Sequence, residues 1–281
     1  MDIALLKTFL EVVKQRHFGK AADTLCITQS AVSARIKLLE SQLGVQLLVR
    51  ERKEIQLTPA GHRLLRHAET IVSGWERARQ EIALAPAFSA SLAVGLAQDL
   101  WSIQLKHWVA QMRRHQPAVA LRIETHPGET LVRRLTGHLL DLAFMFEPPM
   151  MQGLETEQVL EVPLALVASR PGLGVTEAMA GDYLLVDWGS AFSVRHAELF
   201  PDLSTPVIKV NAGVLAVDLL LEMGGCAYLS QRMVQQEIDQ GCLFPVADAP
   251  VISRFAYAVY SPHSQRLESI RQALSILRSL P

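Results

Sequence analysis

The chain has 281 residues, of which 49% are hydrophobic and 20% are charged, and its formal net charge is −1; these values exclude a disordered chain and leave room for two or three compact units. Its three cysteines, Cys26, Cys226 and Cys242, are widely spaced, so neither a disulfide framework nor a zinc site can be read from them. The N-terminus carries no signal-peptide pattern and no stretch reaches about 18 apolar residues, so we expect a cytoplasmic protein that does not span a membrane.

The charge is unevenly distributed along the chain. Residues 1–57 contain nine Lys or Arg against six Asp or Glu, whereas residues 86–281 contain 14 against 19. A basic N-terminal part attached to an acidic body indicates a nucleic-acid-binding module joined to a second domain.

Residues 2–43 show the pattern of three short helices. Asp2 is expected to cap the first, whose buried face would consist of Leu5, Leu6, Phe9, Leu10 and Val13. The second and third lie on either side of a break at Cys26-Ile27-Thr28, and the third has an apolar stripe made of Val32, Ile36, Leu39 and Leu43. Two short helices joined in this way are typical of a helix-turn-helix.

The third helix carries side chains of the kinds that read DNA bases. Glutamine pairs with adenine, arginine or lysine with guanine, and serine with either, while alanine contacts the thymine methyl group. Thr28 is the expected N-cap, and the free backbone N–H groups behind it would hold a phosphate. The predicted DNA-contacting residues, which we expect to lie away from the apolar stripe, are Thr28, Gln29, Ser30, Ala31, Ser33, Arg35 and Lys37.

A short strand pair with a basic tip follows. Arg50, Arg52 and Lys53 lie between the apolar segments Leu47-Leu48 and Ile55–Leu57, which predicts a two-stranded wing placed to touch the DNA backbone. The alternative is an ordinary solvated helix followed by a charged hairpin. The order of the elements together with the residue types favours DNA binding.

A long helix is predicted from Thr58 onward, because Thr is favoured at the N-cap and Pro in the first turn. Its apolar residues repeat with heptad spacing, which forms a narrow seam suited to pairing with another helix. The predicted dimerisation residues are Leu64, Ala68, Ile71, Trp75, Ala78 and Ile82. A helix that packs only on its own domain is the alternative. Ala83–Ala90, with Pro86, is expected to end the helix and form a hinge.

From Ser91 strands and helices alternate, which predicts an α/β fold with a largely parallel sheet. The first series is expected to hold strands at Ser91–Ala97, Ala120–Thr125 and Leu140–Phe146 and helices at Trp101–His115 and Glu129–His138. The second is expected to hold strands at Leu164–Ala168, Leu184–Asp187, Val207–Val210, Cys226–Leu229 and Leu243–Val246 and helices near 192–199, 212–222 and 230–240. Strand Phe255–Tyr260 and helix Gln265–Leu280 should return to the first lobe, with crossovers at Glu161-Val162-Pro163 and Tyr260-Ser261-Pro262.

Ligands of open α/β sheets bind beyond the carboxyl ends of the strands, often on helix N-termini. The predicted effector-binding residues are therefore Gln98, Asp99, Ser102, Thr125, His126, Asn211, Ala212 and Gly213. Ordinary loop and cap roles are the alternative for each position. Asp99 would place a negative charge where a carboxylate ligand would bind, which indicates either an effector that is not a simple anion or a cleft that binds nothing.

No catalytic or metal-binding pattern is present in the sequence. The chain lacks the G-x-S-x-G, H-E-x-x-H, Walker A and dinucleotide-binding fingerprints, so we expect no enzyme activity, no cofactor and no metal. Gly224-Gly225-Cys226 is interpreted as a helix C-cap leading into an apolar strand rather than as a nucleophile.

Residues 1–60 also carry a dense pattern of individual residue types. It consists of Leu6, Phe9, Ala21-Ala22, Leu25, Thr28-Gln29, Ser33, Ile36, Leu39-Glu40, Leu43-Gly44, Leu47, Arg50, Leu57-Thr58 and Ala60-Gly61. This pattern resembles the winged helix-turn-helix of the LysR-type transcriptional regulators, and Trp101, Trp108 and Asp187-Trp188-Gly189 add a narrower similarity to one subgroup of that family. Ser30 stands where the family usually has Pro and Ala34 where it often has Arg, so we expect a different base preference.

The resemblance implies an α/β protein with an N-terminal all-α winged helix-turn-helix at 1–58, a long linker and dimerisation helix at 59–87, and an effector domain at 88–281. That domain would have two lobes, as in periplasmic binding proteins, the first about 88–162 and 262–281 and the second about 163–261. The implied function is sequence-specific binding to double-stranded operator DNA by a homodimer or homotetramer, modulated by a small-molecule effector; contact with RNA polymerase is left open. A ligand-independent architectural or repressor DNA-binding protein of the same fold is the alternative, and an enzyme with an appended DNA-binding domain is the second.

Overall fold

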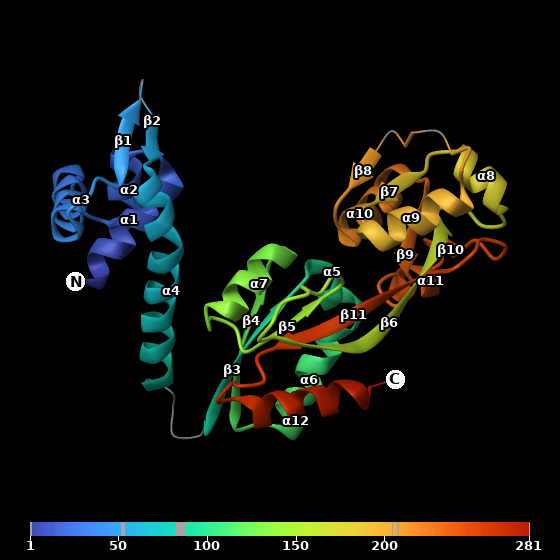
Figure 1. Cartoon of the computed structure of the whole chain (residues 1–281). Helices are drawn as coiled ribbons and strands as arrows, with labels where there is room; N and C mark the ends of the chain where they lie inside the picture. Colours follow the sequence, from blue (N-terminus) through green and yellow to red (C-terminus); the bar gives the residue numbers. More distant parts are fainter. Residues whose placement is uncertain (1, 52–53, 83–87, 204, 207, 281) are drawn as a thin grey trace. The chain divides into compact units, whose positions relative to one another are not determined.

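Figure 1 shows the computed structural model of the chain, which describes residues 2–51, 54–82, 88–203, 205–206 and 208–280. The chain divides into two compact units, one made mainly by residues 1–85 and the other mainly by residues 86–281. In the ranges given above, no helix combines the length and the apolar character that a membrane crossing requires.

The N-terminal unit contains the elements predicted for it. They are α1 (Ile3–Gln15), α2 (Phe18–Leu25), α3 (Gln29–Leu43), β1 (Leu48–Glu51), β2 (Glu54–Leu57) and α4 (Pro59–Ile82). The predicted caps are confirmed: the Asp2 carboxylate accepts the N–H of Ala4 at 2.9 Å, and the Thr58 hydroxyl accepts the N–H of Gly61 at 3.0 Å. The core of this unit lies between α1, α2 and α3, where Leu6, Phe9, Ala21, Val32 and Leu39 are fully buried, and α4 closes it with Ala68 and Val72.

The first lobe of the C-terminal unit is built on three parallel strands. These are β3 (Ala90–Leu96), β4 (Val119–Thr125) and β5 (Leu142–Met145). The helices of this lobe are α5 (Gln98–Leu100), a π-helical turn η1 (Trp101–Leu105), α6 (Lys106–His115), α7 (Gly128–Thr136) and α12 (Leu267–Arg278). The predicted helix at Trp101–His115 is therefore present but starts at Gln98 and contains a π turn, and α12 packs into the first-lobe core as expected through Ile270, Ala273 and Leu274.

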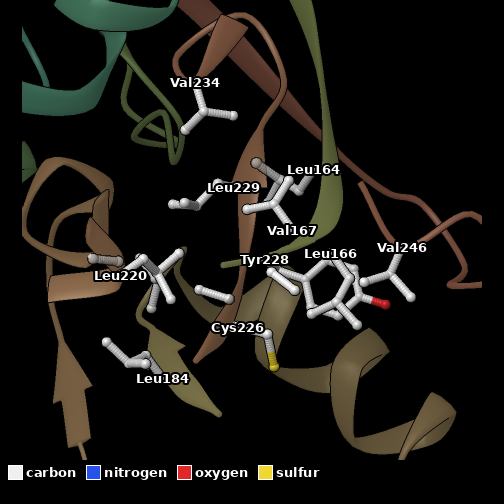
Figure 2. Packing of buried hydrophobic residues seen from close by; sticks show 14 of the residues in the cluster. Leu164, Leu166, Val167, Leu184, Leu220, Cys226, Tyr228, Leu229, Val234 and Val246 are labelled. Carbon is white, nitrogen blue, oxygen red and sulfur yellow. The ribbon is translucent and has the colours of Figure 1, made fainter. Parts of the chain in front are cut away.

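The second lobe surrounds a separate apolar core. Its elements are α8 (Val175–Ala180), β7 (Leu184–Val186), α9 (Ser190–Leu199), β8 (Ile208–Val210), α10 (Gly213–Met223), β9 (Cys226–Ser230), α11 (Gln235–Asp239) and β10 (Phe244–Pro245). Figure 2 shows how side chains from different segments meet in this core, with Leu166 and Val167 close to Tyr228, and Leu220 and Leu184 on the other side of Cys226. Helix α8 was not predicted, because six residues are too few to show a helical period.

The two lobes are joined by a long antiparallel strand pair, β6 (Glu155–Ala168) and β11 (Ile252–Tyr260). The register runs from Glu155 opposite Tyr260 to Leu164 opposite Ile252, and β11 also pairs antiparallel with β5. The prediction of a largely parallel sheet was therefore wrong: the parallel strands of the first lobe continue into antiparallel ones.

The position of one crossover also differs from its prediction. Ala256, Ala258 and Tyr260 belong to the first-lobe core, whereas Ile252 belongs to the second-lobe core. The second crossover thus lies between Ile252 and Ala256, within β11, and not at Tyr260-Ser261-Pro262. The prediction placed it after the strand, but here the strand itself passes between the lobes.

Two glycines of α4 give a matched test of this packing. A Cβ at Gly61 would overlap the carbonyl oxygen of Leu47 and lie 2.8 Å from a methyl carbon of Leu57, whereas a Cβ at Gly74 would meet nothing within 4 Å. We expect Gly61→Ala to lower the free energy of unfolding by about 1–3 kcal/mol through overpacking. Gly74→Ala should raise it by roughly 0.5–1 kcal/mol, since alanine favours helix. Calorimetry of both full-length variants at one protein concentration checks this; equal shifts of the same sign would contradict the packing.

Candidate functional site

Helix α3 presents a polar face that starts at its N-cap. The Thr28 hydroxyl accepts the N–H of Ala31 at 3.2 Å and is hydrogen-bonded to the Ser30 hydroxyl at 2.9 Å. Of the predicted DNA-contacting residues on this helix, Thr28, Gln29, Ser30 and Lys37 are exposed, and Ala31, Ser33 and Arg35 are half-buried. Val32, Ile36 and Leu39 face the core, so the opposite side of α3 is open to a large partner.

Arg35 does not share this face. At 3.6 residues per turn it lies on the flank of α3 opposite to Ser33, and its Nη1 donates a hydrogen bond to the Thr8 hydroxyl of α1 at 3.3 Å. The prediction of a common polar face is therefore wrong for Arg35. The helical spacing alone did not show whether this flank of α3 faces solvent, and in the structure it faces Thr8 of α1. Ala34, not Arg35, is exposed together with Ser30 and Lys37.

The wing forms as the sequence predicts, as far as the backbone is described. Strands β1 and β2 pair antiparallel, with Leu48 opposite Leu57 and Arg50 opposite Ile55. Arg52 and Lys53, which were predicted to form the basic tip, lie outside the described residues, and so does the side chain of Arg50.

The predicted dimerisation seam of α4 consists of a part packed on the same unit and an exposed part. Ala68 is fully buried and Leu64 is partly buried against the core of the same unit, so these two positions do not form a free seam. Heptad spacing could not predict this, because an apolar helix face that packs on its own domain has the same spacing as one that packs on a partner. Further along, Ile71 is 39%, Trp75 50% and Ile82 87% exposed, and Ala78 is exposed as well.

A cavity of about 360 Å³ opens between the two lobes. It lies beyond the carboxyl ends of β3, β4, β5, β7 and β8, as the rule for open sheets requires. Five of the predicted effector-binding residues line it, namely Gln98, Asp99, Thr125, His126 and Asn211.

The other three predicted effector-binding residues lie elsewhere. Ser102 lines a different groove of about 590 Å³, which Lys106, Asp218 and Arg232 also border. It was grouped with Gln98 from its place after strand β3, but the helical turns α5 and η1 carry it around to another side. Ala212 and Gly213 are buried at the start of α10, and a Cβ at Gly213 would meet the Trp188 ring at 2.9 Å.

Asp99 is a structural carboxylate in this arrangement. It is buried, and its Oδ1 accepts the N–H of Gly213 at 2.9 Å, so a residue of the first lobe caps helix α10 of the second. Burial raises the pKa of Asp99 although the N–H groups of Gly213 and Val214 lower it. The negative charge that made Asp99 awkward for an anionic ligand thus occupies the helix N-terminus itself.

A second carboxylate acts in the same way on α9. Glu147 follows β5, and its Oε1 accepts the N–H of Ser190 at 2.8 Å and the Ser190 hydroxyl at 2.9 Å. Gly189, with φ of +90°, allows this approach, because a Cβ there would lie 2.5 Å from Glu147 Oε1 and 2.8 Å from Arg254 Nη1. The two second-lobe helix N-termini next to the cavity, those of α9 and α10, are therefore capped by carboxylates from outside the second lobe.

Sequence reasoning missed Arg254, which also lines the cavity. Its side chain is only 3% exposed and its guanidinium lies over the Phe146 ring, 5.1 Å from the centroid. A signal was available: Ile252, Arg254 and Ala256 alternate along a strand, and the side-chain period of two puts the arginine on the same buried face. That this buried face borders a cavity at Arg254 follows only from the tertiary structure, in which β11 passes between the lobes at this point.

His126 belongs to an ionic cluster at the edge of the cavity. Its Nε2 is hydrogen-bonded to Glu124 Oε2 at 2.9 Å, and Glu124 also pairs with Arg122 and, at 2.8 Å, with Arg134. Burial raises the pKa of Glu124, but the hydrogen bond to His126 and the two arginine charges lower it, and the net shift is downward. His126 is thus oriented by Glu124 rather than free to follow a ligand.

The Gly224-Gly225-Cys226 segment has the structural role that was predicted. Gly224 is the C-cap of α10, with its N–H bonded to the carbonyl of Leu220, and Cys226 begins β9. Cys226 is buried, and burial raises the pKa of its thiol to about 12, so the reactive thiolate does not form near neutral pH.

The chain matches two protein-family models that together cover most of its length. Residues 3–62 match the bacterial regulatory helix-turn-helix protein, lysR family, and residues 87–280 match the LysR substrate binding domain. The HTH-type transcriptional regulator HdfR of Yersinia enterocolitica is 38% identical over 98% of this chain and 95% of its own. The narrower similarity noted in the sequence, to a subgroup of the family, is thereby confirmed as a similarity to HdfR proteins.

Solved structures show the same fold over the whole chain. CbnR, a LysR family transcriptional regulator, superposes with a TM-score of 0.79 at 18% identity, covering all of both chains. Full-length CbnR complexed with its target DNA gives a TM-score of 0.75 at 18% identity over 99% of each chain. The two family models and the relative identical at more than a third of its positions establish that this chain belongs to the LysR family of DNA-binding transcriptional regulators and is not an enzyme.

Proposed function

We propose that this chain binds double-stranded operator DNA as a homodimer, with α3 in the major groove. The observation that carries the proposal is the exposed polar face of α3, on which Gln29, Ser30 and Lys37 follow the Thr28 cap. Gln29, Ser30 and Ser33 are assigned to base edges, and the basic residues of the wing, Arg50, Arg52 and Lys53, to the phosphate backbone.

The rest of the chain is assigned to pairing and control. We propose the division into a DNA-binding part at 1–58, a linker helix at 59–87 and a regulatory part at 88–281. Exposed Ile71, Trp75 and Ile82 support pairing through the second half of α4. A small-molecule effector in the interlobe cavity would act by binding one arrangement of the lobes better than another. We place the protein in the cytoplasm, where it would meet the chromosome and RNA polymerase.

One observation favours the alternative, a ligand-independent DNA-binding protein. Asp99 and Glu147 already cap the N-termini of α10 and α9 at the cavity, so the lobes are held together by the protein's own carboxylates. A ligand that binds both lobe arrangements equally would change nothing in DNA binding. Whether a metabolite changes the DNA footprint decides between the two functions.

The assignment of α3 predicts a base-specific effect of Gln29→Ala. Loss of a bidentate pair with adenine should weaken binding to the preferred operator by about 1–3 kcal/mol and leave binding to a scrambled duplex nearly unchanged. Fluorescence anisotropy on both duplexes, with the operator identified by genome-wide mapping of bound sites, measures this.

Arg35→Ala is the matched control on the same helix. Because Arg35 binds Thr8, this variant should lower the thermal stability of the N-terminal unit and keep the discrimination between operator and scrambled DNA. Loss of discrimination in Arg35→Ala but not in Gln29→Ala would reverse the assignment.

The dimer assignment predicts that Trp75→Glu separates the protomers. The carboxylate of Glu at position 75, which is exposed in the single chain, would lose its hydration between the paired helices. Burying this charge is unfavourable when no opposite charge compensates it. Since two linked readers gain about 10²–10⁴ in avidity, operator binding should fall by a factor of that order. Light scattering with operator titration tests this, with Thr70→Glu, on another face of α4, as control. An intact Trp75→Glu dimer would place the interface elsewhere.

The effector assignment predicts a metabolite that both stabilises the protein and changes its footprint. A tenfold preference for one lobe arrangement corresponds to about 1.4 kcal/mol and redistributes two nearly balanced states. A thermal-shift screen of a metabolite library on the full chain, followed by footprinting with each hit, measures both effects. If no compound shifts the unfolding midpoint and the footprint never changes, the ligand-independent function is the correct one.

A further inference from the structure

The interlobe cavity has an unusual distribution of charge for a site expected to hold an anion. Three carboxylates line it, those of Asp99, Glu147 and Asp187, against one guanidinium, that of Arg254. A ligand with only negative charge would therefore meet more like charge than opposite charge. A ligand with only positive charge would meet the buried guanidinium.

On the second lobe, the usual anchors for an anion are already taken. A helix N-terminus binds anions through its free N–H groups, but the N–H of Gly213 on α10 is held by Asp99 and that of Ser190 on α9 by Glu147. A ligand carboxylate would have to displace one of these carboxylates to reach either helix. A group that accepts a ligand acid without this displacement has to lie away from these two helix N-termini.

Arg254 has the properties of that group. Its side chain is 3% exposed, and among the described residues its Nη1 is buried without a hydrogen-bond acceptor. The nearest acid, Glu147 Oε1, lies 3.8 Å away, beyond hydrogen-bonding distance, and is engaged by Ser190. Phe146 below the guanidinium and the backbone of Gly189 beside it hold the group in place, so the guanidinium is preorganised where it lines the cavity.

A positively charged ligand group would find its partner in Asp187, which lines the same cavity. Asp187 bonds the N–H of Gly189 through Oδ1, and its Oδ2 lies 3.5 Å from Lys209 in an exposed pair, which holds the carboxylate only weakly. Asp187 therefore keeps acceptor capacity toward the cavity, and Asn211 and Thr125 add neutral polar groups.

We propose that the interlobe cavity binds an α-amino acid, with the carboxylate of the ligand on Arg254 and its ammonium group next to Asp187. A zwitterion matches both signs of charge in the cavity and leaves the caps of α9 and α10 intact. The volume of about 360 Å³ lies at the small end of ligand pockets and suits a metabolite of this size. This inference rests on the proposed effector role of the cavity and specifies the class of effector.

The test uses the full-length protein and matched ligands. Each of the twenty protein amino acids is tested singly by thermal shift, and the Kd of any that stabilises the protein is measured by calorimetry. For that amino acid, the amine without the carboxylate and the acid without the amine are measured as well. We expect both analogues to bind at least tenfold more weakly than the amino acid itself.

Three variants locate the site. Arg254→Lys keeps the charge but loses the planar guanidinium, and should weaken binding of the amino acid tenfold or more. Asp187→Asn should weaken the amino acid and strengthen the acid that lacks the amine, because it removes a repelling charge. Arg195→Met is the control: Arg195 is 59% exposed on α9 and pairs with Glu198, so its loss should leave binding unchanged.

The outcomes separate this inference from the proposed function. Selective binding of an amino acid that Arg254→Lys and Asp187→Asn weaken and Arg195→Met does not would support the assignment. Equal or tighter binding of the acid without the amine would overturn it, while the effector role stands. Absence of binding by all twenty amino acids would also overturn it. The effector role itself then depends on whether any other metabolite changes the footprint.

Discussion

The pairing of β6 with β11 holds the C-terminal unit together. The ladder extends from the pair Glu155 and Tyr260 in the first lobe to the pair Leu164 and Ile252 in the second. Its register shifts once, between Ala256 and Tyr257. Both crossovers are thus hydrogen-bonded to each other. A change in the angle between the lobes has to bend or twist a two-stranded ribbon, which retains its hydrogen bonds, instead of moving two independent loops.

The same ladder determines the chemistry of the cavity. Arg254 lies opposite Val162 at the crossover, and the alternation of the strand turns its side chain inward between the lobes. Burial lowers the pKa of Arg254, and the charges of Glu147 and Asp187 oppose that shift. Burying a charge is unfavourable unless it is compensated. The neighbouring acids provide part of this compensation, although neither makes a direct hydrogen bond to Nη1.

In the N-terminal unit one helix has two roles. One face of α4 completes the core through Ala68 and Val72, and from Ile71 onward another face exposes Ile71, Trp75 and Ile82. The orientation of α3 depends on that core, because Val32, Ile36 and Leu39 pack into it and the Arg35–Thr8 hydrogen bond joins α3 to α1. The polar face of α3 is what remains after these contacts are made.

Local chemistry determined most of what the sequence by itself could show. The caps at Asp2, Thr28 and Thr58, the apolar stripe of α3 and the alternation of strands and helices after Ser91 depend on neighbours within a few residues, and each was predicted. The five cavity residues at strand ends followed from one topological rule, because the carboxyl ends of strands in an open sheet face a common cleft.

Only the tertiary structure decided how shared faces and distant charges are used. Ala68 and Trp75 occupy the same heptad position. Ala68 is buried in the core of the N-terminal unit and Trp75 is exposed, because that core ends partway along α4. Ser102 turns into another groove because α5 and η1 intervene, and Arg254 reaches the cavity because β11 passes between the lobes. Asp99 lies far from Gly213 in the sequence yet caps its helix. Contacts of this kind join residues that are distant in the sequence, and the local periodicity of apolar residues carries no information about them.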